Sequence, residues 1–205
     1  MIVLQKIQKR YREKIVLDDF SYTVEKGAFL VITGASGSGK TTLLNIMGLL
    51  ETPDKGSVCI DGQEFDKPRK KQMFYRYKAG FLFQNFALLE DKTVFENLKL
   101  ALQYQKSTSK KHEISEALEE VGLSGIEGKK VFQLSGGEQQ RLALARLLLK
   151  NPQYIFADEP SGNLDMQNRD LVFDHLEQLN KRGKTVLLVT HDNDLVAKAK
   201  ELICL

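Results

Sequence analysis

A glycine-rich segment that ends in a lysine and a threonine is the first feature of this sequence that could do chemistry. GASGSGKT at 34–41 fits G-x-x-x-x-G-K-[ST] and lies between the strand-like run FLVIT and a helical run. Such a loop lets successive N–H groups point at phosphate oxygens, and the following helix adds the positive end of its dipole. We expect Lys40 to reach the β- and γ-phosphates and Thr41 to place its hydroxyl on Mg²⁺. The nucleoside-triphosphate site predicted here comprises Gly34, Ala35, Ser36, Gly37, Ser38, Gly39, Lys40, Thr41 and Thr42.

Two adjacent acids follow an apolar, strand-like run later in the chain. In YIFADEP at 154–160, Asp158 and Glu159 end the run, which predicts that they lie at the carboxyl edge of a sheet, where ligands of such folds bind. Successive side chains of a strand point in opposite directions, so the two acids should have different roles. Asp158 suits the coordination shell of Mg²⁺, and Glu159 suits a general base that faces the attacking water.

A second predicted helix N-terminus carries an unusual pair of glycines. In LSGGE at 134–138, Ser135 and Glu138 form the S-x-x-E pattern of a capping box. Capping does not require Gly136 and Gly137, which are poor helix formers but permit an anion to approach bare N–H groups. Because the chain already has one phosphate cradle, a second one favours a head-to-tail dimer with two nucleotides between the subunits.

The segments between these motifs alternate between short apolar runs and helical stretches, which predicts an α/β fold with a mostly parallel sheet. Strands are predicted at Ser21–Val24, Phe29–Thr33, Ser57–Ile60, Ala79–Phe83, Tyr154–Ala157, Thr185–Thr190 and Leu202–Leu205. Helices are predicted at Lys40–Leu50, Val94–Gln103, Lys111–Val121, Gly136–Lys150 and Gln167–Arg182. The stretch from about 93 to 150 is therefore almost wholly helical and interrupts the alternation.

Composition and charge exclude several classes of protein, among them collagens and disulfide scaffolds. The 205 residues include 30 Lys and Arg against 27 Asp and Glu, and a net charge of +3 is too small to indicate a nucleic-acid-binding protein. The apolar run LALARLLL at 142–149 is far shorter than the roughly 20 residues that span a bilayer, and Arg146 interrupts it. The basic stretch PRKK at 68–71 is interpreted as solvated surface. Cys59 and Cys204 stand in apolar runs and are interpreted as reduced core residues.

Four motifs taken together resemble those of one family. GASGSGKT, LSGGEQQR (134–141), YIFADEP and THD (190–192) stand in the order found in ATP-binding cassette (ABC) transporters, and LSGGE separates that family from other P-loop proteins. The resemblance to the ATP-binding subunit covers essentially the whole chain. It implies a P-loop NTPase with a RecA-like core, a small antiparallel β lobe and an inserted helical lobe. In this single ABC ATPase domain, 1–92 and 151–205 would form the core with the β lobe, and 93–150 the helical lobe.

The resemblance also implies roles for residues outside these motifs or at their ends. Gln84 in FLFQNF resembles the Q-loop glutamine, which touches Mg²⁺ and the attacking water. His191 resembles the switch histidine that contacts the γ-phosphate, and Asp165 resembles the D-loop aspartate at the dimer interface. Tyr11 resembles the aromatic residue that stacks on adenine; a half-buried strand aromatic is the alternative, and Tyr22 is a weaker competitor.

The chemistry implied by the resemblance is hydrolysis of ATP with Mg²⁺ as cofactor. Water attacks the γ-phosphate in line, while Mg²⁺, Lys40, His191 and the partner subunit's Ser135 spread the developing charge. By analogy Ser135 and Gly137, with Gly136 nearby, contact the γ-phosphate bound by the partner chain. ATP is thus expected to bridge two like subunits into a homodimer, and hydrolysis to remove the bridge.

A transporter subunit that lacks a membrane span requires a separate integral-membrane permease, whose coupling helix is expected in a groove near 84–97. The chain is then cytoplasmic and peripheral on the inner face of the cell membrane. FADEPSGNLD and FLFQNFALL look most like the branch that serves lipoprotein release, macrolide efflux and antimicrobial-peptide export, although Ser161 replaces a common threonine. The opening KRYREKIVLDDFSYTVEKG favours the bacteriocin-export group, and the chain end at Leu205 predicts no C-terminal regulatory domain.

Proteins of other classes share parts of this pattern. A non-transport ABC ATPase that acts on DNA would call for coiled-coil arms or a zinc insertion, yet the sequence has neither heptads nor C-x-x-C, and an ABC translation factor would carry two cassettes. A GTPase would show N-K-x-D, whereas NKRG at 180–183 lacks the aspartate. A small-molecule kinase would leave LSGGE and THD unexplained. The transporter subunit is the interpretation that accounts for all four motifs.

Overall fold

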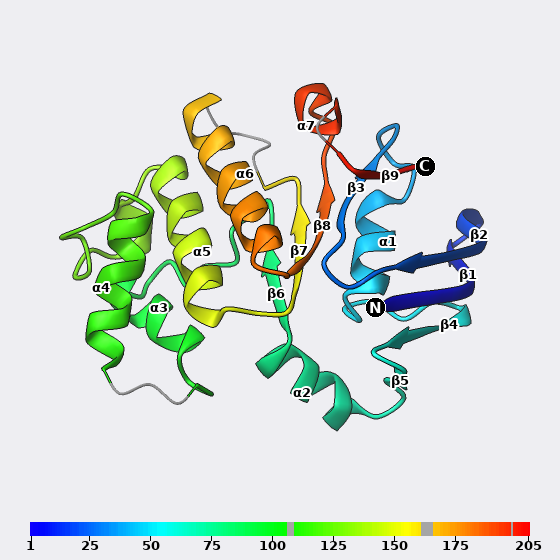
Figure 1. Ribbon diagram of the computed structural model, residues 1–205, viewed down its shortest axis with the longest axis horizontal. Coiled ribbons are helices and arrows are strands. Elements are labelled where there is room, and N and C mark those ends of the chain that lie inside the picture. The colour runs from blue at the N-terminus through cyan, green and yellow to red at the C-terminus, as the bar shows by residue number, and fades with distance from the viewer. Residues whose placement is uncertain (106–108, 161–165, 198) are drawn as a thin grey trace.

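The chain folds into a parallel sheet, a smaller antiparallel sheet and the helices that cover them (Figure 1). The computed structural model describes residues 1–105, 109–160, 166–197 and 199–205. The strands are β1 (Ile2–Tyr11), β2 (Lys14–Val24), β3 (Phe29–Thr33), β4 (Lys55–Ile60), β5 (Gln63–Glu64), β6 (Ala79–Leu82), β7 (Tyr154–Asp158), β8 (Thr185–Val189) and β9 (Glu201–Cys204). The helices are α1 (Lys40–Met47), α2 (Pro68–Tyr77), α3 (Val94–Ala101), α4 (Lys110–Glu120), the 3₁₀ turn η1 (Val131–Gln133), α5 (Gly136–Lys150), α6 (Met166–Lys181) and α7 (Asn193–Ala197). The predicted α/β fold is confirmed.

The parallel sheet has the strand order β6-β7-β8-β3-β9, and every neighbouring pair is parallel. All five residues of β8 are buried, as expected of a strand covered on both faces. Val189 of β8 is the register partner of both Ile32 in β3 and Asp158 in β7. The three central strands therefore end at the same level, and the loops that follow them meet at one edge of the sheet.

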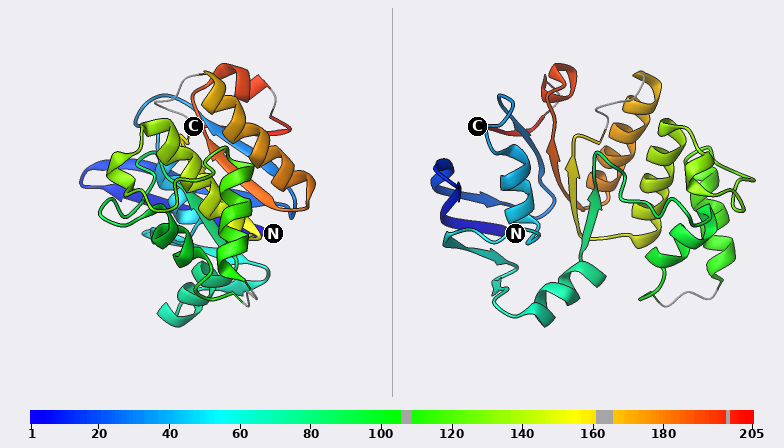
Figure 2. Two further views of the ribbon diagram at one scale, coloured as in Figure 1. Left: turned by 90° about the vertical axis from the view of Figure 1, so that its left-hand side faces the viewer. Right: turned by 180° about the vertical axis from the view of Figure 1, so that it is seen from behind.

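The antiparallel sheet has the order β2-β1-β4-β5 and encloses α1 against the parallel sheet (Figure 2, right). The inward side chains Ile2, Leu4 and Ile7 are fully buried and belong to the same core cluster as those of α1. Register shifts interrupt β1, and Lys6 lies at one of them with a φ of 49°. These bulges bend the strands around α1.

The helices α3 to α6 pack on the opposite face of the parallel sheet, where they share a second core cluster with its side chains. The helical stretch from 93 to 150 is thus present between β6 and β7, as predicted. Asn151, with a φ of 47°, ends α5, and Gly183, with a φ of 82°, follows α6, as their sequence positions indicate. No described helix is long and apolar enough to cross a membrane.

Several sequence predictions are wrong in detail. The first helix ends at Met47 rather than Leu50, because Gly48 caps it and Leu49 adopts a φ of 62°. Cys204 is exposed and Cys59 only half-buried, so neither is a core residue, although both are free thiols. Cys204 ends an edge strand in which Ile203 is the one buried residue, so an apolar run did not guarantee burial.

Candidate active site

The predicted chemical residues gather at the carboxyl edge of the parallel sheet. The phosphate loop follows β3, the two acids end β7, and His191 comes two residues after β8. Glu159 N donates to Val189 O over 3.0 Å, and Thr190 N donates to Ile32 O over 3.2 Å, so the strand pairing continues up to the reactive side chains. The topology therefore brings together residues that are up to 157 positions apart, between Gly34 and His191.

The loop backbone leaves room that only glycine provides. Gly34 and Gly39 have φ values of 143° and 106°, a region that L side chains rarely adopt. A methyl group on Gly34 would overlap the backbone carbonyl of Leu205, and one on Gly39 would overlap a methyl of Val16. The N-terminus of α1 has no side-chain cap and no acid in its first turn, which leaves its N–H groups available to an anion.

Lys40 and Lys14 both turn toward the loop carbonyls. Lys40 Nζ donates to Gly34 O at 3.0 Å and to Ala35 O at 2.9 Å, and Lys14 Nζ donates to Gly37 O at 3.0 Å. A phosphate group offers charged acceptors that bind an ammonium group more strongly than neutral carbonyls do. Lys40, the first residue of α1, therefore lies beside the position expected for the triphosphate.

Thr41 and Asp158 form the part of the site that could hold a metal ion. The Thr41 hydroxyl donates to Asp158 Oδ1 over 3.1 Å, so strand β7 and helix α1 bring two oxygen ligands together. Burial raises the pKa of Asp158, as does the nearby charge of Glu159, while the Thr41 hydrogen bond and Lys40 act in the opposite direction. Oxygen ligands of this kind suit Mg²⁺, which commonly takes only one or two protein ligands beside phosphate. Among the described residues no group of three or more His, Cys, Asp or Glu could hold a metal ion.

Glu159 and His191 are in direct contact across the neighbouring strand ends. Glu159 Oε1 lies 2.8 Å from His191 Nδ1, and because a carboxylate only accepts, the ring nitrogen donates. The Glu159 side chain is 16% exposed, that of His191 70%. Glu159 has a φ of 45°, an unusual value for a non-glycine residue and one often found at functional sites.

Gln84 follows β6 at the same edge of the sheet and is exposed. Helix α5 holds the loop that continues after Gln84. Arg146 of α5 donates through Nη2 to Phe86 O over 2.8 Å and through Nη1 to Ala87 O. Both carbonyl residues have positive φ values, 61° and 47°. Burial lowers the pKa of Arg146. The motifs of the sequence give Arg146 no role, although a single arginine within the apolar run LALARLLL is a signal for one.

Tyr11 lies at the end of β1 beside the phosphate loop. Its hydroxyl donates to the Glu51 carboxylate and lies 3.4 Å from Thr42 Oγ1, and its side chain remains 45% exposed. Tyr22, in contrast, packs against the core cluster under the antiparallel sheet and stacks on Phe20 with ring centroids 6.3 Å apart. Of the two candidates for an adenine contact, Tyr11 is the one that lies beside Thr42 in the first turn of α1.

The signature segment at 134–138 has the predicted capping box. Glu138 N donates to Ser135 Oγ at 3.3 Å, while Ser135 N and Ser135 Oγ each donate to Glu138 Oε2 at 2.8 Å. A methyl group on Gly136 would meet only open space, whereas one on Gly137 would collide with Asn168 of α6. A methyl group on Gly137 would therefore displace the Asn168 side chain, which accepts a hydrogen bond from Arg141, and the sequence position of Gly137 did not reveal this contact.

This segment does not reach the phosphate loop of its own chain. α1 and α5 belong to separate core clusters on opposite faces of the parallel sheet. Both helices begin toward the same end of the molecule, the upper one in Figure 1. Asp165, the predicted D-loop residue, lies outside the described residues. A γ-phosphate between a phosphate loop and a signature segment would therefore need two copies of the chain.

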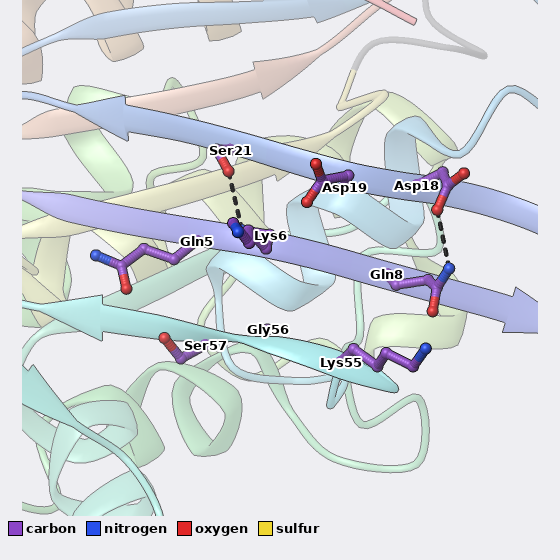
Figure 3. A pocket seen from close by; sticks show the side chains of 9 residues that line it. All are labelled: Gln5, Lys6, Gln8, Asp18, Asp19, Ser21, Lys55, Gly56 and Ser57. Carbon is purple, nitrogen blue, oxygen red and sulfur yellow. Dashed lines mark hydrogen bonds between the residues drawn. The ribbon is translucent and has the colours of Figure 1, made fainter.

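A polar hollow elsewhere on the surface is not part of this site. It has a volume of about 710 Å³ and lies on the outer face of β1, β2 and β4 (Figure 3). Its lysines and aspartates have mixed charge, and Gln8 Nε2 already donates to Asp18 Oδ1 over 2.8 Å. The hollow contains none of the residues predicted from the motifs.

The chain resembles proteins of one family along nearly its whole length. The profile of a family described as ABC transporter matches residues 17–162. The chain is 40% identical over 209 residues to the macrolide export ATP-binding/permease protein MacB of Bdellovibrio bacteriovorus, covering 99% of this chain and 32% of that protein. It is 38% identical over 208 residues to the cell division ATP-binding protein FtsE of Mycobacterium tuberculosis, covering 99% and 90%. The chain thus spans about a third of the MacB relative.

Solved structures give a similar result. The dimeric structure of MJ0796, described as a bacterial ABC transporter cassette, superposes with a TM-score of 0.91 at 37% identity, covering 100% of this chain and 94% of that one. The dimeric post-hydrolysis state of the same cassette, bound to ADP and Pi, also gives a TM-score of 0.91, at 36% identity.

Proposed function

Since the chain belongs to the ABC transporter family as an ATP-hydrolysing cassette, we propose that it pairs with a second copy upon binding ATP and so powers export through a separate integral-membrane permease. The observation that carries this proposal is the convergence at one sheet edge of the phosphate loop, Asp158, Glu159 and His191. The signature segment at the N-terminus of α5, on the other face of the sheet, would then contact the nucleotide bound by the partner subunit.

In the proposed reaction, the triphosphate replaces the loop carbonyls as the acceptor for Lys40. The N–H groups of the loop and of the uncapped α1 bind the β- and γ-phosphates, and Lys40 neutralises their charge. Thr41 and Asp158, with Gln84 as a third candidate, would hold Mg²⁺, which neutralises charge on the phosphate oxygens when bound. Tyr11, next to Thr42, would support the adenine.

Glu159 takes a proton from the attacking water. The hydrogen bond from His191 Nδ1 fixes one carboxylate oxygen and the ring orientation, which leaves the other oxygen for water. In the imidazolium form of His191, Nε2 would also carry a proton and would donate to the γ-phosphate. The partner subunit's Ser135 would donate to the same phosphate and complete the charge stabilisation.

A groove of about 480 Å³ supports the proposed permease contact. It lies between α2, β6, α3 and α5, and its wall includes Phe83 just before Gln84, Ala87 three residues after Gln84, and Arg146. A coupling helix seated there would press on the loop that Arg146 holds. In the proposed division, 1–92 and 151–205 form the core with the β lobe and 93–150 form the helical lobe, and the groove would lie between them. A permease bound there would hold the chain on the inner face of the cell membrane. The contact would transmit nucleotide state between site and permease.

The exported substrate follows only from the branch that the chain resembles. The MacB relative, named for macrolide export, and the FLFQNFALL and FADEPSGNLD segments support export of a lipophilic molecule or an antimicrobial peptide such as a bacteriocin. Identity of 38% to a cell division ATP-binding protein over 90% of its length supports a role in cell division as the second candidate.

Phosphate release tests the proposed enzyme directly. Wild-type chain with Mg-ATP should release phosphate without any added acceptor, and Glu159→Gln should bind ATP normally but lose about 100-fold or more of the rate. Lys111→Gln, on the exposed face of α4, serves as the control and should retain the wild-type rate. Consumption of ATP that requires a small-molecule acceptor, with the phosphoryl group transferred to that acceptor rather than released as phosphate, would instead identify a kinase and overturn the proposal.

A further inference from the structure

The segment around α2 carries the strongest local charge of the chain. Residues 67–78 contain six of the 30 basic residues and none of the 27 acidic ones. The rest of the chain therefore has 24 basic against 27 acidic residues, a net charge of −3. The basic character of the protein is concentrated in this one helix and its flanks.

Two faces of α2 line different hollows. Gln72, Tyr75 and Arg76 face the groove proposed for the permease. Arg69, Met73 and Tyr77, spaced by four residues, form a stripe along a second hollow of about 420 Å³, shared with β5. Figure 1 shows α2 at the lower end of the molecule, and Lys150 at the end of α5 donates to Tyr75 O of α2 over 2.6 Å. The outer stripe therefore borders the groove proposed for the permease.

The stripe combines exposed apolar side chains with unpaired cations. Met73 is 46% exposed and Tyr77 52% exposed, whereas Phe74 alone is buried and anchors the helix. Lys70 pairs with Asp66 at 2.8 Å. The side chains of Lys67 and Arg69 are exposed and form no ion pair or hydrogen bond with any residue in the described ranges. Two cations thus remain available beside two exposed apolar groups.

This combination fits the surface of a lipid bilayer. Cations near an anionic bilayer gain about 1 kcal/mol each, and tyrosine and methionine can bury their apolar parts at the headgroup level. Four of the six basic residues are lysines, which are depleted in the cores of protein interfaces. We propose that the outer face of α2, comprising Lys67, Arg69, Lys70, Met73 and Tyr77, docks on anionic phospholipid headgroups beside the permease. This inference rests on the proposed function for its orientation, but the chain alone can test it.

Vesicle sedimentation measures the contact. The full chain should bind vesicles of phosphatidylcholine mixed with phosphatidylglycerol more tightly than vesicles of phosphatidylcholine alone, and salt should weaken that binding. The double variant Lys67→Gln/Arg69→Gln should bind the anionic vesicles about 30-fold more weakly. The matched control Lys111→Gln/Arg182→Gln removes the same charge from exposed positions in α4 and just after α6, and it should change binding less than about twofold.

A second variant separates the apolar contribution from the charge. Met73→Gln keeps every charge and should weaken vesicle binding about fivefold, with a loss that salt does not alter. Retained phosphate release by each variant would show that the ATPase site is intact, so a loss of vesicle binding reports on α2 alone. Absence of phosphate release from the wild-type chain would instead contradict the proposed function.

Three results would overturn the inference. Equal losses of vesicle binding for the two double variants would show that binding depends on the net charge of the chain and not on α2. Equal binding of the wild-type chain to both vesicle types would show that it does not prefer anionic phospholipid. If Lys67→Gln/Arg69→Gln kept vesicle binding but lost its association with the permease in detergent, the face would bind an acidic protein surface instead.

Discussion

The N-termini of α1 and α5 are both placed to meet phosphate, yet they are built in opposite ways. The α1 end has a left-handed glycine as its N-cap, no side-chain cap and no acid in the first turn. The α5 end has a complete capping box, in which the Glu138 carboxylate accepts from both the amide and the hydroxyl of Ser135. One helix end leaves its donors to a ligand, and the other satisfies part of its own.

The difference indicates an order of binding. ATP needs only the open α1 end, with Lys40 beside it, to bind a single subunit. The signature end also carries a negative charge that disfavours a free anion, so it should contribute only when the partner presents a phosphate already neutralised by Lys40 and Mg²⁺. In the proposed dimer, capping would thereby make pairing of the subunits dependent on bound nucleotide.

The largest effect is expected from a substitution at the uncapped N-terminus of α1. Lys40→Ala removes the cation beside the β- and γ-phosphates and should reduce hydrolysis by about 1,000-fold, with a matching loss of ATP affinity measured by calorimetry. Lys14→Ala is the control, because Lys14 also donates to a loop carbonyl, that of Gly37, but does not stand at the helix end. Similar losses for the two variants would contradict the special role of Lys40.

A smaller effect separates stability from activity at the capped end. Gly136→Ala meets open space in the single chain and should stabilise α5 by about 0.5 kcal/mol, through helix propensity. Because the methyl group would block the approach of the partner's phosphate, hydrolysis should fall about 10- to 100-fold while ATP affinity at low protein concentration stays unchanged. Gly128→Ala, which also meets open space, should leave hydrolysis unchanged.

The smallest effect is expected on the stability of the two helices that begin with a capping box, α5 and α3. The backbone and hydroxyl of Ser135 hold the pKa of Glu138 below its ordinary value of 4.5, so the carboxylate stabilises the fold above that pH and loses this effect as the pH falls through the folded pKa. Glu138→Gln should therefore cost about 0.5 kcal/mol in unfolding free energy at pH 7, and this cost should disappear as the pH falls through the folded pKa of Glu138.

Glu96 closes an equivalent box with Thr93 at the start of α3, and there the amide of Thr93 lowers the carboxyl pKa. Glu96→Gln should follow the same pH profile in chemical denaturation. A pH dependence found for Glu138 alone would show that its carboxylate has a structural role beyond capping.

The sequence predicted the structure best in segments where a single requirement, either burial in the sheet or the binding of phosphate, explains the type of each residue. Apolar runs located β3, β7 and β8, and the motifs at their ends located Lys40, Asp158 and Glu159. β1 was not predicted because its register shifts disturb the alternation of buried and exposed residues. α2 was not predicted because Phe74 is its one buried residue, so it shows no apolar period.

Contacts between distant segments could not be predicted from the pattern of any one of them. The Glu159–His191 hydrogen bond follows from the order of β7 and β8 in the sheet, and the contact of Gly137 with Asn168 follows from the packing of α5 on α6. Arg146 was noticed only as an interruption of an apolar run, because its acceptors lie 59 and 60 residues away.

Light scattering on Glu159→Gln tests the central claim, that ATP joins the open end of one subunit to the capped end of another. Without nucleotide the variant should have the mass of one 23.2 kDa chain, and with Mg-ATP about twice that mass, because the bound triphosphate is not hydrolysed. Adding Ser135→Arg should abolish the dimer but not ATP binding. A variant that binds Mg-ATP and remains a monomer at every protein concentration, or a dimer that survives Ser135→Arg, would contradict the account.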